Sequence, residues 1–139
     1  MGIMLVEDAM TSAVVTLSPD ETLRDAINLL RSKRIRHLPV VDASRLVGIV
    51  TDRDVKRATP SVLSGMAKAE YDSALLKMRV AQFMTREPVT VTRKSGLKTA
   101  VGIFIDKKVG ALPVVDDGHL VGILTEIDVL RVAYDLLSD

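Results

Sequence analysis

The apolar positions in the first half of the chain change their spacing several times, and each spacing predicts one element. Continuous apolar runs predict strands, whereas apolar residues three and four apart predict a helix with one buried face. The run from Leu38 to Val41 is apolar throughout, which is typical of a strand buried on both faces. The predicted elements are a strand from Val14 to Leu17, a helix carrying Leu23, Ala26, Ile27 and Leu30, a strand from Leu38 to Val41, a strand from Leu46 to Val50 and a helix from about Asp52 to Ala58.

Turn and cap residues give the boundaries of these elements. Ser18-Pro19-Asp20-Glu21 combines a capping side chain, an early proline and first-turn acids, so it predicts the start of the first helix. Asp42-Ala43-Ser44-Arg45 lies between two apolar runs and predicts a hairpin turn. The order in each unit is therefore strand, helix, strand, strand, helix.

The second half repeats this pattern 74 residues later without a gap. Over residues 10–58, 20 of 49 positions are identical to those of the second copy. Because a unit of about 50 residues buries little surface alone, we expect two β-α-β-β-α repeats to pack into one α/β (α+β) body with internal pseudo-twofold symmetry. The predicted domains are a first repeat at residues 6–59 and a second at residues 80–135, joined by a 60–79 linker with a short helix from Ala67 to Met78.

Composition excludes several classes of protein. The 139 residues include 19 basic and 18 acidic side chains, no cysteine and few aromatics, so we expect neither nucleic-acid binding nor a thiolate site. Two histidines cannot close a zinc site, so no metal is expected. No apolar run approaches the roughly 20 residues that span a bilayer, and the N-terminus lacks the basic start of a signal peptide. We therefore expect a soluble, cytoplasmic protein with no membrane partner.

The tract after the last strand of each copy carries the candidate chemistry. It is Gly48-Ile49-Val50-Thr51-Asp52-Arg53-Asp54 in the first copy and Gly122-Ile123-Leu124-Thr125-Glu126-Ile127-Asp128 in the second. Thr and Asp three apart lie one turn apart where a strand enters a helix. The hydroxyl and the helix start suit a phosphate, and the carboxylate suits the vicinal hydroxyls of a ribose. Alternatively, Thr51 is only an N-cap and Asp54 only a first-turn acid.

The ordered set M-T, V-x-T, L-P-V-V-D and V-G-I-x-T-x-x-D occurs twice, and it resembles a tandem pair of cystathionine-β-synthase (CBS) domains, a Bateman module. The resemblance runs from about Val6 to Val132 apart from the linker, and it is closest to the stand-alone CBS domain proteins. It implies a regulatory module that binds AMP, ADP, ATP or S-adenosylmethionine in clefts between the repeats. The implied ligand-binding residues are Thr51 and Asp54, Thr125 and Asp128, Arg36, His37 and Arg53 at phosphate, and Thr16 and Thr90 near the base or ribose.

The two copies differ in their cations. Arg36-His37 becomes Gly110-Ala111, and Arg53 becomes Ile127. We therefore expect the first site to bind a phosphorylated nucleotide more strongly, and the second to take a less charged ligand or none. No catalytic motif is present, and the protein is predicted not to be an enzyme. The alternative function is a nucleotide-free scaffold for dimerisation and protein interaction, and the resemblance also suggests a homodimer with an unidentified regulated protein.

Overall fold

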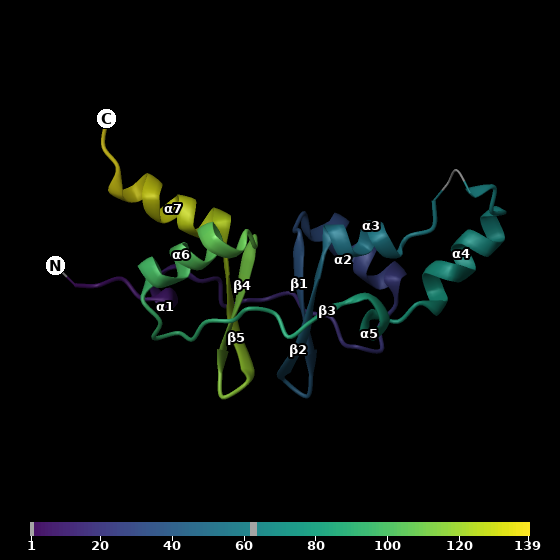
Figure 1. Cartoon of the computed structure of the whole chain (residues 1–139), viewed down its shortest axis with the longest axis horizontal. Helices are drawn as coiled ribbons and strands as arrows, with labels where there is room; N and C mark the ends of the chain where they lie inside the picture. The colour runs from purple at the N-terminus through teal and green to yellow at the C-terminus, as the bar shows by residue number, and fades with distance from the viewer. Residues whose placement is uncertain (1, 62–63) are drawn as a thin grey trace. The chain divides into compact units, whose positions relative to one another are not determined.

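The computed structural model describes residues 2–61 and 64–139 and divides them between two compact units. The first unit is Val15–Glu87, and the second combines the residues up to Val14 with Pro88–Asp139 (Figure 1). Each unit therefore contains most of one sequence repeat and the start of the other. The mixed fold of helices and antiparallel hairpins, with two repeats, is confirmed.

In its described residues, the first unit contains a hairpin, four helices and a short edge strand. Its elements are α2 (Leu23–Lys33), β1 (His37–Asp42), β2 (Arg45–Thr51), α3 (Asp52–Ala58), α4 (Lys68–Lys77), α5 (Val80–Phe83) and β3 (Thr85–Arg86). The two strands of the hairpin and the helix after them lie where the sequence predicted them. The linker helix predicted from Ala67 to Met78 is α4, which buries Leu75 and leaves Leu76 exposed.

The second unit has counterparts of the hairpin and of α2, α3 and α5, in a different chain order. They are α1 (Val6–Ala9), α6 (Leu97–Lys107), β4 (Ala111–Asp116), β5 (His119–Thr125) and α7 (Glu126–Leu136). The short helices α1 and α5 were not predicted from the sequence. In the described residues, no helix is both long and apolar enough to cross a membrane.

Both hairpins turn on residues with left-handed backbone, as the predicted turns require. Ala43 and Ser44 have φ of 49° and 67°, and Asp117 and Gly118 have φ of 49° and 81°. Two consecutive residues with positive φ match the right-handed twist of the flanking strands. The hairpin predictions are confirmed, with β1 antiparallel to β2 and β4 antiparallel to β5.

Two predictions near the first helix are wrong. Residues Val14 to Leu17 do not form a strand, because only Leu17 makes a bridge, parallel to Val40. The helix begins at Leu23 rather than near Ser18. Glu21 accepts the backbone N–H of Ser18 at 2.9 Å and so closes a separate turn, whereas Thr22 accepts the N–H of Asp25 and caps the helix. Both segments carry capping chemistry, and the second one starts the helix.

The start of each repeat packs into the hydrophobic core of the other repeat's unit. Val80, from the second repeat, is fully buried in the cluster that includes Leu38 and Val50. Val6, from the first repeat, is fully buried in the cluster that includes Leu112 and Leu124. Burying each valine contributes about 1.5 kcal/mol or more. Apolar burial therefore anchors each of these segments in the unit that contains most of the other repeat.

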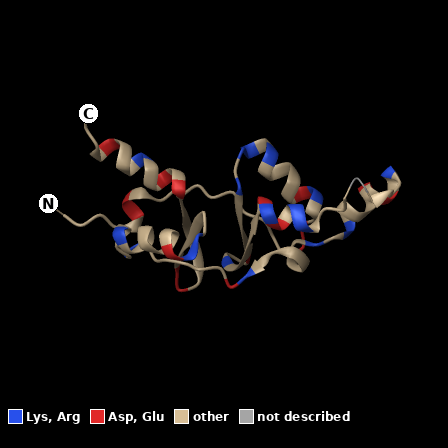
Figure 2. Cartoon of the chain, turned by 45° about the horizontal axis from the view of Figure 1, so that its top comes forward, with Lys and Arg blue, Asp and Glu red and all other residues tan. Residues whose placement is uncertain are grey.

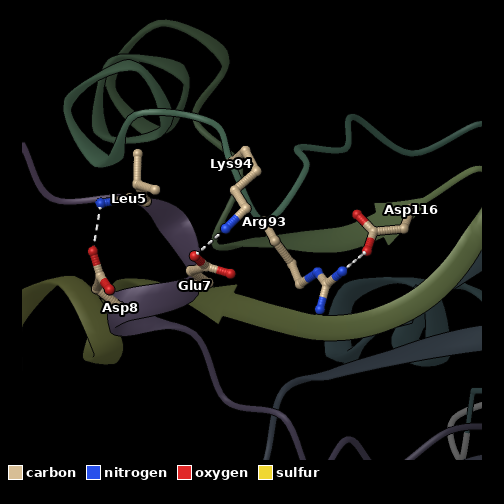
Figure 3. A network of polar contacts seen from close by, with 6 residues as sticks. All are labelled: Leu5, Glu7, Asp8, Arg93, Lys94 and Asp116. Atoms are coloured by element: carbon tan, nitrogen blue, oxygen red, sulfur yellow. Dashed lines mark hydrogen bonds and ion pairs between the residues drawn. The ribbon is translucent and has the colours of Figure 1, made fainter.

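Residues of both charge signs are interspersed along both units (Figure 2). Polar contacts surround α1 in the second unit, and one of them joins it to the turn before α6 (Figure 3). Lys94 Nζ lies 2.7 Å from Glu7, and Arg93 lies 2.6 Å from Asp116. These cations stand where the first repeat has Pro19 and Asp20, and they are engaged in ion pairs within the second unit.

Candidate functional site

The Thr51–Asp54 pair lies where β2 ends and α3 begins. Thr51 Oγ1 accepts the N–H of Asp54 at 3.2 Å, and the Asp54 carboxylate accepts the N–H of Thr51 at 2.9 Å. The Thr51 hydroxyl also donates to Asp54 at 3.1 Å. This is a reciprocal capping box, so the cap role considered from the sequence is present in the structure.

The Thr125–Asp128 pair forms the same capping box at the start of α7. The Asp128 carboxylate accepts the N–H of Thr125 at 2.8 Å, and Thr125 Oγ1 accepts the N–H of Asp128 at 3.3 Å. The two pairs differ in exposure. Asp128 is only 6% exposed, whereas Asp54 is half-buried. The carboxylate of the first unit is therefore the more accessible one.

Each motif carboxylate receives a further hydrogen bond from the other repeat. The Thr85 hydroxyl lies 3.2 Å from both carboxylate oxygens of Asp54. The Thr11 hydroxyl lies 3.1 Å from Asp128 Oδ1. Sequence reasoning missed both threonines as site residues, although the repeated Met-Thr dipeptide outside the predicted elements was the available signal.

The glycines of the motif make room for these same segments. A Cβ on Gly48 would lie 2.6 Å from Met84 Sδ and 2.9 Å from the Thr85 carbonyl oxygen. A Cβ on Gly122 would lie 2.7 Å from Met10 Sδ. β3 pairs Arg86 with Gly48 directly. The absence of a side chain at Gly48 therefore admits a close approach by the chain's own second repeat.

The candidate cations are brought to the Thr51 turn by the backbone. His37 is paired with Thr51 across the β1–β2 ladder, and the N–H of Asp52 donates to the Arg36 carbonyl at 3.2 Å. Arg53 is the second residue of α3, and Arg36 and Arg53 are both exposed. Three residues with cationic or imidazole side chains thus flank one threonine.

The second unit keeps this backbone without those side chains. Ala111 is paired with Thr125, and the N–H of Glu126 donates to the Gly110 carbonyl at 3.2 Å. Ile127 occupies the second position of α7, where α3 has Arg53. The charge asymmetry seen in the sequence is therefore an asymmetry between two turns of the same geometry.

The remaining candidates are Thr16 and Thr90. Each precedes a residue that forms a parallel bridge to a hairpin strand: Leu17 with Val40, and Val91 with Val114. The N–H of Leu17 donates to the Pro39 carbonyl at 2.9 Å, which sets half-buried Thr16 next to β1. Thr90 is exposed and precedes Val91, which bridges Val114 in the same way. In residues 2–61 and 64–139, no hydrogen bond joins either threonine to the Thr–Asp turns.

Comparison with known proteins agrees with this architecture. A family model described as "CBS domain" matches residues 6–61 and 80–135. A CBS domain-containing protein of Dictyostelium discoideum is 34% identical over 137 residues, which is 97% of this chain and 94% of that protein.

Two solved structures that are similar to this chain contain adenosine ligands. CBSX2 in complex with AMP is 33% identical with a TM-score of 0.80, and the match covers 95% of this chain and 97% of that one. The CBS domain pair of protein MJ0100, in complex with 5′-methylthioadenosine and S-adenosyl-L-methionine, is 27% identical with a TM-score of 0.76 and covers 94% and 99%. Two matched repeats, two Thr–Asp turns and these relatives lead to one assignment: the chain belongs to the CBS domain family, as a tandem pair.

Proposed function

We propose that this chain is a regulatory module that senses an adenosine nucleotide of the AMP, ADP and ATP class at the Thr51–Asp54 turn. The observation that carries the proposal is the placement of Arg36 and His37 beside Thr51, next to a half-buried carboxylate. Cationic and N–H donors form strong hydrogen bonds with phosphate oxygens. Two similar CBS pairs, solved with AMP and with S-adenosyl-L-methionine, support the adenosine class.

The proposed roles follow from the donors and acceptors of each side chain. Asp54 accepts hydrogen bonds from ribose hydroxyls, since an ionised carboxylate has about four acceptor sites. Thr51, Arg36, His37 and Arg53 face the phosphate, and Thr16 lies near the base or ribose. The module acts by binding and carries out no reaction of its own.

The second turn is proposed to have a different ligand preference. Thr125, Asp128 and Thr90 repeat the ribose set, but Gly110, Ala111 and Ile127 supply no cation. Asp128 is also nearly fully buried. This turn therefore takes a ligand with less negative charge, such as S-adenosylmethionine, or none.

Isothermal titration calorimetry with AMP tests the assignment on a matched pair of variants. Asp54→Ala is expected to weaken AMP binding by tenfold or more, since it removes the ribose acceptor, whereas Asp128→Ala changes it less than about twofold. Circular dichroism of both variants controls for folding. Equal losses would refute the asymmetry between the turns, and a wild-type chain that binds no adenosine ligand would refute the function.

The second candidate function is a nucleotide-free scaffold for homodimerisation or partner binding, and the surface of α7 favours it. Ile127, Leu130 and Tyr134 are 55%, 61% and 82% exposed and recur at helical spacing. The corresponding positions of the first repeat are Arg53, Lys56 and Pro60. Exposed apolar patches of this kind mark interaction sites.

Thermal denaturation separates the two candidates. A ligand that binds only the native state stabilises it by about 2.7 kcal/mol at a concentration of 100 times Kd, and so raises the Tm. A rise with adenosine nucleotides supports sensing. An unchanged Tm across AMP, ADP, ATP and S-adenosylmethionine, together with a dimer in analytical ultracentrifugation, supports the scaffold.

A further inference from the structure

We propose that the Thr85 hydroxyl is a latch on the Asp54 carboxylate, and that a ribose displaces it on binding. Ligand binding would thereby loosen the short strand Thr85–Arg86 of the second repeat from the first unit. This inference rests on the proposed function and adds a mechanism by which an occupied site is communicated along the chain.

The acceptor capacity of Asp54 provides the first argument. A carboxylate offers about four acceptor sites. The backbone N–H of Thr51 and its hydroxyl use two sites on Oδ2, at 2.9 and 3.1 Å. The Thr85 hydroxyl donates between Oδ1 and Oδ2, at 3.2 Å from each. About one site remains, whereas a ribose diol that donates both hydroxyls needs two.

The donor that can leave is Thr85. The two hydrogen bonds from Thr51 belong to the cap of α3, and their loss would disrupt the helix start. Thr85 is exposed and bonds equally to both oxygens, so its hydrogen can turn to water instead. The diol therefore competes with Thr85 and not with Thr51.

The strand β3, to which Thr85 belongs, is held by few other contacts, whereas Val80, Phe83 and Met84 before it pack in the core of the first unit. β3 has only two residues, Thr85 and Arg86, which pair with Ile49 and Gly48. Both residues are exposed, and Met84 contacts the face of Gly48. Short exposed elements open with low free energy. Loss of the Thr85 hydrogen bond is therefore a large fractional change for this strand.

The second unit provides a matched control. Thr11 donates to Asp128 Oδ1 at 3.1 Å, and the Asp128 capping box is otherwise the same. Asp128 is nearly fully buried, unlike Asp54. A change at Thr11 should therefore leave the affinity of the Thr51–Asp54 turn unaltered.

The test is calorimetry of AMP and of 2′-deoxyadenosine 5′-monophosphate with Thr85→Val, Thr85→Ser and Thr11→Val in the full chain. Thr85→Val keeps the shape and removes the donor, so AMP binds about fivefold tighter, the scale of one hydrogen bond to a charged group that water partly replaces. The AMP affinities of Thr85→Ser and Thr11→Val stay within about twofold of the wild-type affinity. The deoxynucleotide shows no gain with Thr85→Val, because its single hydroxyl fits the remaining acceptor site.

Each outcome discriminates between the ideas. Weaker or unchanged AMP binding by Thr85→Val, with Asp54→Ala still weakening it tenfold or more, overturns the latch and leaves the nucleotide site standing. An equal gain for both nucleotides also overturns the latch, since it would mean a general loosening of the site. A wild-type chain that binds neither nucleotide overturns the proposed function and the latch together.

Discussion

Replacing Gly48 with alanine tests whether this glycine exists to admit the second repeat. The new Cβ would lie 2.6 Å from Met84 Sδ and 2.9 Å from the Thr85 carbonyl oxygen. The flexible Met84 side chain can move away, but the carbonyl belongs to the backbone of β3. Ordinary van der Waals contact begins at 3.4 Å, so Thr85 must shift by about 0.5 Å.

The energetic cost follows from that shift. Overpacking of this kind costs about 1–3 kcal/mol. Displacing Thr85 also weakens its hydrogen bond to Asp54, which is worth about 1.5–3 kcal/mol as a bond to a charged group. Alanine recovers about 0.4–1 kcal/mol by restricting the unfolded chain. We expect Gly48→Ala to lower the free energy of unfolding by about 1–4 kcal/mol.

Urea denaturation measures this change, and Gly102 supplies the control. Gly102 lies inside α6, and a Cβ placed on it meets nothing within 4 Å. Gly102→Ala should therefore stabilise the chain by about 0.5–1 kcal/mol through helix propensity. Amide hydrogen exchange at Thr85 and Arg86 should speed up in Gly48→Ala alone. If the two variants were equally stable with equal exchange, the contact of β3 with Gly48 would not support the second repeat, and the reasoning would be refuted.

Two further substitutions test other parts of the structure. Thr22→Ala removes the cap of α2 and should cost about 0.5–2 kcal/mol in urea denaturation, whereas Ser18→Ala, which keeps the Glu21 turn bond, should cost clearly less; the reverse order would restore Ser18 as the helix start. Arg36→Ala should weaken AMP binding about tenfold in calorimetry while changing adenosine binding less than about twofold, because a guanidinium stabilises the phosphate and not the ribose; equal losses for both ligands would contradict its phosphate role.

The hairpins and the helices that follow them could be predicted from the sequence because their determinants are local. The apolar run of β1, the turn at Ala43 and Ser44 and the apolar run of β2 are consecutive in the chain. The start of α2 was less predictable for a local reason as well. Ser18 with Glu21 and Thr22 with Asp25 are both capping patterns, and only packing decides which one is followed by helix.

The candidate site could be predicted only in part. The Thr–Asp spacing predicted the capping turns, and the resemblance to CBS domains pointed to Arg36 and His37 just before the L-P-V strand, which the structure pairs with the Thr51 turn. The third hydrogen-bond partner was missed because its contact is long-range. Thr85 is 31 residues from Asp54, and Thr11 is 117 residues from Asp128. Neither periodicity nor cap chemistry carries information over such separations.

The first residues of the two repeats carry equivalent buried and hydrogen-bonding side chains. Something else must therefore direct each starting segment to the unit that contains most of the other repeat. Val6 and Val80 are equivalent, as are Thr11 and Thr85, so apolar burial and the hydroxyl contact would be satisfied in either unit. Charge distinguishes the segments. Glu7 pairs with Lys94 at 2.7 Å in the second unit. The position equivalent to Lys94 in the first unit is Asp20.

Docking of the first segment in the first unit would therefore place Glu7 beside Asp20, two like charges where the observed arrangement has an ion pair. In the segment that begins the second repeat, Ala81 is the equivalent of Glu7. The Arg79 guanidinium of this segment instead donates to the Asp20 carbonyl at 3.0 Å. Exposed pairs contribute only about 0.2–1 kcal/mol each. Between two otherwise equal alternatives, however, the small repulsion and the lost pair add in the same direction. The divergence of Glu7, Asp20 and Lys94 between the repeats thus favours the exchanged arrangement, and that arrangement supplies each motif carboxylate with its threonine.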